Sequence, residues 1–232
     1  MVGVEYLAPT SYAQSDHQEI VKLAKKLTNG LKAADAIKSV YFFVRDYIKW
    51  TIEGVKPAIK VLESKKGACF NKASLQIALL RAASIPARYR LEEVRSDVLK
   101  PYLPADIYKL LAETIIHVLA EVYVNGMWMG CDATLDFQLS HPQWKRDWEL
   151  GLDLSCIPSI YRLRILGTYP DLPVNLLLKP FENIINQEGV TAKIEEHLDK
   201  IRAMTPDEKF KLFLDSWGPN VVSILVRGRI KK

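Results

Sequence analysis

Two segments in the first quarter of the chain have the hydrophobic spacing of amphipathic helices. Apolar residues recur at i, i+3, i+4 and i+7 between about residues 34 and 49, which places them on one helical face. A first helix is expected near 17–28, with Ser15 or Asp16 as its cap and Asn29-Gly30 as its stop. Both helices should lay an apolar face on a common core.

A third helix is expected from Cys69 to Ser84, and its pattern differs from the first two. It is rich in helix formers and apolar around much of its circumference, which is typical of a helix in the middle of a domain. Ile85-Pro86 should end it, because proline disfavours helical backbone in the residue before it. A short extended segment at 50–52 should precede this helix, and a strand at 87–94 should follow it.

The next segment predicts a β-hairpin. Residues 114–124 and the run from Met127 onward alternate around Asn125-Gly126, and Asn-Gly between such runs is the strongest short-range hairpin signal. Residues 96–113, which contain two prolines, indicate an inserted loop with one short helix.

After about residue 140 the pattern weakens, and prolines interrupt it repeatedly. Two late helices are expected, at about 192–204 and 207–217, the second opened by a capping box at residues 205–208. Gly218-Pro219 should stop that helix, and residues 221–226 would then form a terminal strand.

Composition narrows the functional classes. With 232 residues, 49% of them hydrophobic, the chain can form one substantial core or a core with a smaller appended lobe. No apolar run has the ~20 residues of a membrane span, and the first residues lack the features of a secretory signal, so a cytoplasmic location is the expectation.

Four of the five net positive charges come from the tail residues Arg227, Arg229, Lys231 and Lys232. A solvated tail therefore explains the basic character better than a nucleic-acid-binding surface.

The hairpin pattern also predicts which side chains share a face. A two-residue turn pairs Val124 with Met127, which places Asp132 diagonal to His117 on one face of the hairpin. The other face is almost wholly apolar and should be the core; it carries Ile116, Val118, Ala120, Val122, Val124, Met127, Met129 and Cys131. His117 and Asp132 alone would be interpreted as a surface ion pair.

Cys69 changes that interpretation, because it stands where the buried helix begins. The chain has only three cysteines, Cys69, Cys131 and Cys156, which argues against a disulfide framework. A helix N-terminus favours the thiolate and presents N–H groups to an oxyanion. Cys69, His117 and Asp132 thus have the residue types of a nucleophilic triad: attacking thiol, proton carrier and orienting carboxylate.

Other polar residues fit less specific roles. A metal site that combines Cys131 with Asp132, His117 and Cys69 is disfavoured, because adjacent strand residues point to opposite faces. Three further histidines lie in polar contexts and are expected to be solvated: His17, His141 and His197. Glu113 and Glu121 could line a cleft but receive no role.

Three blocks of sequence together resemble the transglutaminase-like family. They are Gly67-Ala68-Cys69-Phe70-Asn71-Lys72-Ala73 running on to Arg88, the block from His117 to Trp128, and Asp132-Ala133-Thr134. The order Cys, His, Asp and the hairpin between the last two also match, and the similarity extends from about Ile37 to Thr134. Ser84 and Leu119 depart from common family residues, which leaves substrate choice open.

The resemblance implies an α+β, papain-like or transglutaminase-like fold, with the cysteine-bearing helix packed on an antiparallel sheet. Residues 1–140 would form the catalytic core, with an inserted segment near 96–113, and residues 141–232 a C-terminal extension of loops and helices. Trp50 would be a candidate donor to the oxyanion, although a packing role is favoured for it.

The implied activity is thiol-dependent acyl transfer on amide bonds through a thioester on Cys69. Cysteine peptidase, amidase and transglutaminase-type transamidation all fit, with a protein or peptide as substrate and with no cofactor or metal. The alternative is a non-enzymatic binding domain that retains the triad residues.

Overall fold

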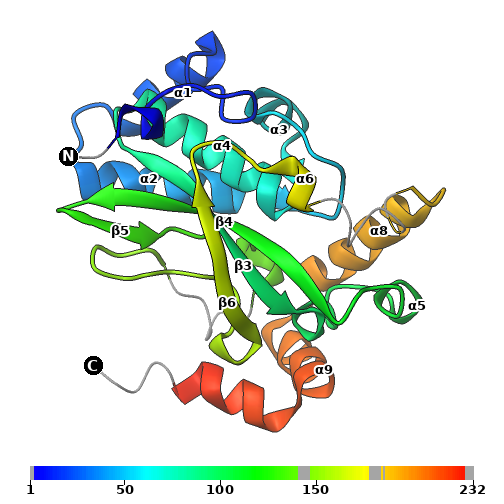
Figure 1. Cartoon of the computed structure of the whole chain (residues 1–232). Helices are drawn as coiled ribbons and strands as arrows, with labels where there is room; N and C mark the ends of the chain where they lie inside the picture. Colours follow the sequence, from blue (N-terminus) through cyan, green and yellow to red (C-terminus); the bar gives the residue numbers. More distant parts are fainter. Residues whose placement is uncertain (1–2, 141–146, 178–183, 185, 228–232) are drawn as a thin grey trace.

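The computed structural model describes residues 3–140, 147–177, 184 and 186–227, and it has an α+β fold built on a four-stranded antiparallel sheet. The strand order is β5-β4-β3-β6, and helices α1 to α4 cover one side of the sheet (Figure 1). The strands are β1 (Lys49–Trp50), β2 (Lys66–Gly67), β3 (Ala87–Arg95), β4 (Thr114–Val124), β5 (Met127–Gly130) and β6 (Arg162–Tyr169). The first two form a separate parallel pair.

The helices follow the predicted order, with one addition in the N-terminal half. They are α1 (Gln18–Thr28), α2 (Ala33–Tyr47), α3 (Ala58–Ser64), α4 (Cys69–Ala82), α5 (Ala105–Tyr108), α6 (Val174–Leu177), α8 (Val190–Ala203) and α9 (Pro206–Arg227). Helix α3 is the addition, because no helix was predicted between the extended segment at 50–52 and Cys69. The cap of α1 is His17, whose Nδ1 accepts from the Glu19 N–H at 3.3 Å, and neither Ser15 nor Asp16 caps it.

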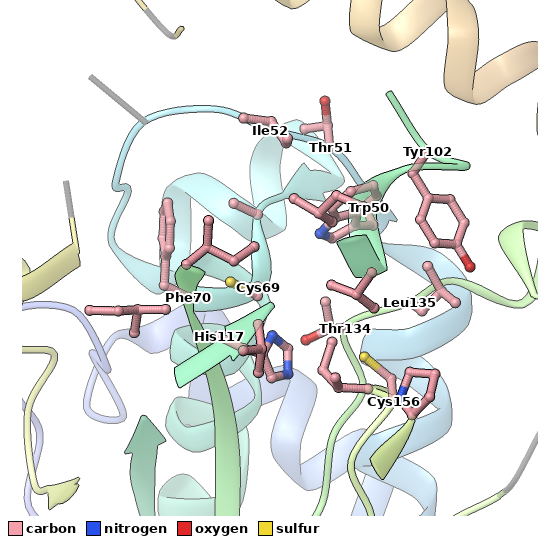
Figure 2. A pocket seen from close by; sticks show the side chains of 18 of the residues that line it. Trp50, Thr51, Ile52, Cys69, Phe70, Tyr102, His117, Thr134, Leu135 and Cys156 are labelled. Carbon is pink, nitrogen blue, oxygen red and sulfur yellow. The ribbon is translucent and has the colours of Figure 1, made fainter. Parts of the chain in front are cut away.

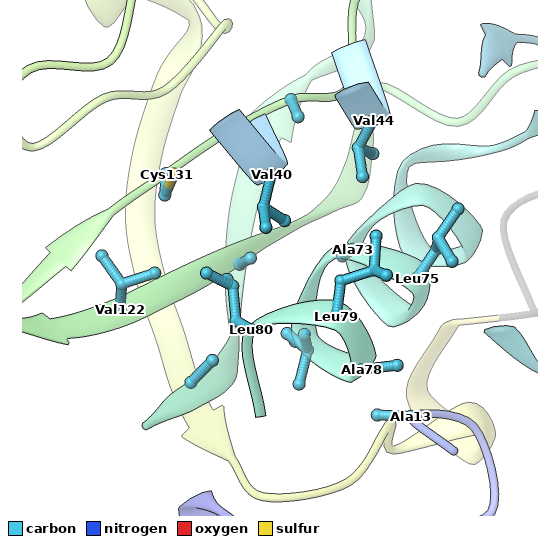
Figure 3. Close-up of a cluster of buried hydrophobic side chains, with 14 of the residues drawn as sticks. Ala13, Val40, Val44, Ala73, Leu75, Ala78, Leu79, Leu80, Val122 and Cys131 are labelled. Carbon is cyan, nitrogen blue, oxygen red and sulfur yellow. The ribbon is translucent and has the colours of Figure 1, made fainter. Parts of the chain in front are cut away.

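Helix α4 is the centre of the main core, as its all-round apolar sequence predicted. Its residues from Phe70 to Arg81 are all buried. Val40 and Val44 of α2 lie on one side of it, and Val122 of β4 and Cys131 lie against it from the sheet (Figure 3). Each fully buried aliphatic side chain of this kind contributes ~1.5–3 kcal/mol to the stability. The helix that begins at Cys69 therefore has a fixed position.

The hairpin has the predicted register. Val124 pairs with Met127 and Glu121 with Gly130, and the Cys131 N–H continues the pattern by donating to the Ala120 carbonyl at 2.8 Å. The core face is as expected except at the tip, where Met127 is 57% exposed.

The face of the hairpin that carries His117 and Asp132 is buried, although its alternation of polar and apolar residues suggested a solvated surface. Arg90 on β3 forms ion pairs with Glu92, Glu121 and Asp153, the last at 2.7 Å. These contacts hold the segment after residue 147 over this face, and His117, Leu119 and Glu121 are all at least 95% buried. The strand β6 lacks a hydrophobic alternation and was not predicted; none of its residues is buried, and half of them are exposed.

The last helix corrects one prediction. The backbone of Gly218 is non-helical (φ 78°), so Gly218-Pro219 does end a helix there. Residues 221–226, however, continue as helix to Arg227 and do not form a strand. Val221 and Val222 are buried in this helix, and tertiary packing of that kind overrides the strand preference of β-branched residues.

A second apolar cluster joins the C-terminal helices to the rest of the molecule. Trp50 packs edge-on against Tyr102, and Tyr102 in turn contacts Phe213 and Trp217 of α9. Helices α8 and α9 lie at the end of the sheet where β3 finishes (Figure 1). Within the described part of the chain, no helix combines the length and apolar character that crossing a membrane requires.

Candidate active site

Cys69 is the first residue of α4, and the short strand β2 leads into it. Gly67 on that strand must be glycine, since a Cβ would lie 2.8 Å from the Asn71 Cβ. Ala68 has extended backbone and its carbonyl accepts the first helical hydrogen bond, from the Lys72 N–H at 2.9 Å. Cys69 is partly exposed and lies at the positive end of a buried helix.

The imidazole of His117 comes from the middle of β4 and meets Asp132 directly after β5. The His117 Nε2 and Asp132 Oδ2 atoms are 2.8 Å apart, and both side chains are buried. Asp132 also accepts from the Thr134 N–H at 3.0 Å and from the Cys156 N–H at 2.8 Å. With Nε2 engaged by Asp132, Nδ1 is the ring nitrogen left to serve a substrate or thiol.

These contacts set the charge of the pair. Burial opposes ionisation of both groups, but their mutual attraction outweighs it, and the pKa of Asp132 falls well below its ordinary value. Burial likewise opposes a charged imidazole, yet Asp132 and contacts with the thiols of Cys69 and Cys156 raise the pKa of His117 well above its ordinary value. Both shifts favour the form of the pair in which the imidazole is protonated and the carboxyl group is ionised.

Cys156 is a neighbour of this pair that the sequence did not reveal. It lies in an irregular stretch 24 residues after Asp132, where no periodicity or motif marks it. Burial and the Asp132 charge raise the pKa of its thiol to about 12, so it stays protonated where the imidazolium is formed.

The same neighbourhood contains a set of donors suited to a metal. Donor atoms of His117, Asp132 and Cys156 lie within 4.8 Å of one another, and nitrogen, oxygen and sulfur are the ligand types of Zn²⁺. Cys131, the thiol first weighed for such a set, is excluded: it faces the core and receives a hydrogen bond from Gln76 at 3.1 Å.

A cavity opens beside Cys69 and His117, and its wall is mainly apolar (Figure 2). Its volume is about 70 Å³. The wall comes from the segments before and after Cys69, from residues 96–113, from β4, from the segments after Asp132 and around Cys156, and from α9. It includes Ile52, Phe70, Val98, Leu99, Tyr102, Ile116, Leu135, Ile157 and Trp217. Residues 96–113 thus contribute directly to the site.

Trp50 lines the same cavity. Figure 2 shows its indole ring across the cavity from His117, with the ring nitrogen on the side where Cys69 lies. Its backbone N–H donates to Asp136 Oδ2 at 2.9 Å, and its carbonyl accepts from Arg202 of α8 at 2.6 Å. The sequence did not point to Asp136 and Arg202, because their role depends on a contact with each other across 66 residues of chain.

The remaining histidines and glutamates stand apart from this site. His17 caps α1, and His197 is partly buried with Nε2 3.2 Å from the Pro101 carbonyl, so neither is simply solvated. Glu121 pairs with Arg88 and Arg90, and it is structural. His141 and the tail residues 228–232 lie outside the described residues.

Comparison with known proteins agrees with this arrangement. Residues 21–133, which include Cys69, His117 and Asp132, match the model of the transglutaminase-like superfamily. The match covers 113 of the 232 residues, just under half of the chain. The transglutaminase-like match ends where the C-terminal segments that complete the cavity begin. No curated protein sequence matches the chain.

Two solved structures are similar to it. One is a candidate cysteine protease from Cytophaga hutchinsonii, with 23% identity and a TM-score of 0.50 over 74% of this chain and 48% of that one. The other is a candidate protease from Parabacteroides distasonis, with 18% identity and a TM-score of 0.37 over 48% of this chain and 22% of that one. The first similarity supports the fold, and the present chain spans about half the length of that relative.

Proposed function

We propose that this protein is a thiol-dependent acyl-transfer enzyme that acts on amide bonds of a protein or peptide through a thioester on Cys69. The observation that carries the proposal is the buried 2.8 Å contact between His117 and Asp132, beside a partly exposed cysteine at the start of a buried helix. The transglutaminase-like match over the same residues supports it.

In the first half of the reaction the Cys69 thiolate attacks the amide carbonyl carbon. A C–S bond forms while the carbonyl π pair moves to oxygen, and N–H groups at the start of α4 together with the Trp50 indole N–H stabilise that oxyanion. The oxyanion then collapses, the C–N bond breaks, and His117 gives its Nδ1 proton to the leaving amine.

In the second half the thioester is cleaved by water or by an amine. Neutral His117 takes a proton from the incoming nucleophile, which attacks the thioester carbonyl and expels the Cys69 thiolate. Asp132 stabilises the imidazolium that results and fixes the ring so that Nε2 faces the carboxylate. Water as acceptor gives hydrolysis, and an amine gives transamidation.

The experiment that tests this function traps the thioester. An acyl p-nitrophenyl ester should release nitrophenolate in a burst equal to the protein concentration, and intact-mass measurement should find one acyl group, on Cys69 by peptide mapping. Cys69→Ala should abolish the burst, while Cys131→Ala should keep it. A folded wild-type protein that forms no adduct at Cys69 would instead indicate a binding domain that retains the triad residues.

A further inference from the structure

The strand β1, which carries Trp50, is held on both of its edges. On one edge it pairs with β2, and the Thr51 N–H donates to the Gly67 carbonyl at 3.2 Å. On the other edge a single ion pair satisfies the backbone of Trp50. Asp136 Oδ2 accepts from its N–H at 2.9 Å, and Arg202 Nη2 donates to its carbonyl at 2.6 Å.

Arg202 and Asp136 also bind each other, which closes the arrangement. Arg202 Nη2 lies 2.9 Å from the same Asp136 oxygen that accepts from Trp50. The side chains are only 8% and 5% exposed. A planar guanidinium has several donors in a fixed geometry, so it can donate to the Asp136 carboxylate and to the Trp50 carbonyl at the same time.

Helix α8 also forms ion pairs with residues of both short strands, β1 and β2. Lys66, three residues before Cys69, forms an ion pair with Glu195 of α8, and Lys49 forms an exposed pair with Asp199. Exposed pairs of this kind contribute little stability, so the buried Arg202 contact is the one that fixes the geometry. Helix α8 thus contacts both strands that lead into the active site, although it lies beyond the family match at 21–133.

We infer that Arg202 and Asp136 are positioning residues, which hold the Trp50 backbone so that its indole N–H faces the oxyanion formed at Cys69. The inference rests on the proposed function and assigns α8 to the catalytic machinery. The Trp50 ring has a packing neighbour on its far side in Tyr102, with ring centroids 5.8 Å apart. The backbone anchor and this contact together fix where the indole N–H points.

The test compares two reactions of the same thiol. Iodoacetamide alkylates Cys69 by direct displacement and forms no oxyanion, whereas p-nitrophenyl butyrate must pass through one. Arg202→Gln should lower the acylation rate by about 100-fold, since a misplacement of ~1 Å or the loss of one oxyanion donor costs about 10² or more in rate. Its alkylation rate should stay at the wild-type value.

Matched variants separate positioning from folding. Lys200→Gln removes the same charge from an exposed site on α8 and should change neither rate. Arg202→Lys keeps the charge but cannot bond Asp136 and the Trp50 carbonyl with one planar fork, so it should restore acylation only in part. If Arg202→Gln fails to fold, the double variant Arg202→Gln/Asp136→Asn removes both charges together and should show the same selective loss of acylation.

Three results would overturn the inference. Acylation by Arg202→Gln at the wild-type rate would show that Trp50 needs no anchor. A parallel fall of acylation and alkylation would show a general loss of the site. A wild-type protein that is alkylated at Cys69 but never acylated there would remove the proposed function, and the inference with it.

Discussion

The backbone N–H of Cys156 donates to Asp132 at 2.8 Å, to the same carboxylate oxygen that contacts His117. A residue from beyond the family match therefore completes the hydrogen bonding of the carboxylate in the proposed triad. Because this N–H helps to keep Asp132 ionised, the segment around Cys156 stabilises the charged form of the His117–Asp132 pair.

The three thiols should differ sharply in reactivity. Cys69 is partly exposed at a helix start, whereas Cys131 is fully buried and burial raises its pKa. Burial and the Asp132 charge raise the pKa of Cys156 to about 12, so almost none of it is thiolate at neutral pH, and the thiolate is the reactive form. Iodoacetamide should therefore modify Cys69 first in the folded protein, as measured by peptide mapping. In urea all three should react, and faster modification of Cys131 or Cys156 in the folded protein would contradict the assignment.

Asp132→Asn should impair acyl transfer strongly and leave the hairpin formed. The amide keeps the shape of the side chain but loses the charge that raises the pKa of His117. The corresponding change in a serine triad costs ~10⁴ in turnover, which sets the upper scale of the expected loss. Burst kinetics measure the loss. The control is Asp215→Asn, an exposed carboxyl on α9, and equal rates in the two variants would contradict a role for Asp132.

The raised pKa of His117 should also appear in the stability of the protein. A pKa that is higher in the folded state contributes stability that is fully present below the unfolded value of about 6.5 and is lost as the pH rises through the folded value. The free energy of unfolding, measured in urea from neutral to alkaline pH, should therefore fall more in the wild type than in Asp132→Asn. Parallel profiles in the two proteins would show that the pair is not charged.

The cavity beside Cys69 should select apolar acyl groups of limited length. Its volume of about 70 Å³ has room for about five to seven water-sized groups, at ~10–15 Å³ each. Acylation by p-nitrophenyl esters should rise by about fourfold per methylene from acetate, because each buried methylene contributes ~0.8 kcal/mol, and then level off. Leu99→Ala should move that plateau to longer chains. Leu163→Ala, on the exposed face of β6, should leave the plateau where it is. Equal acylation rates for all chain lengths would contradict the assignment of this cavity as the acyl-binding site.

Local sequence was sufficient for much of the fold. The all-round apolar helix from Cys69, the Asn125-Gly126 turn and the capping box at Thr205 each depend on neighbours in the chain, and the structure confirms all three. The hairpin register followed from the turn alone, because the side-chain period of a strand is two. That register was enough to predict that His117 and Asp132 lie within reach of each other.

The tertiary structure decided what local pattern does not encode. Residues 221–226 have strand propensity but pack as helix, since burial of Val221 in the second cluster outweighs that preference. The face with His117 alternates like a solvated surface, yet ion pairs of Arg90 bury it. Cys156, Asp136 and Arg202 gain their significance from contacts between segments distant in the chain. Periodicity records only which side of an element is apolar, and it says nothing of which distant charge or backbone group will lie against the other side.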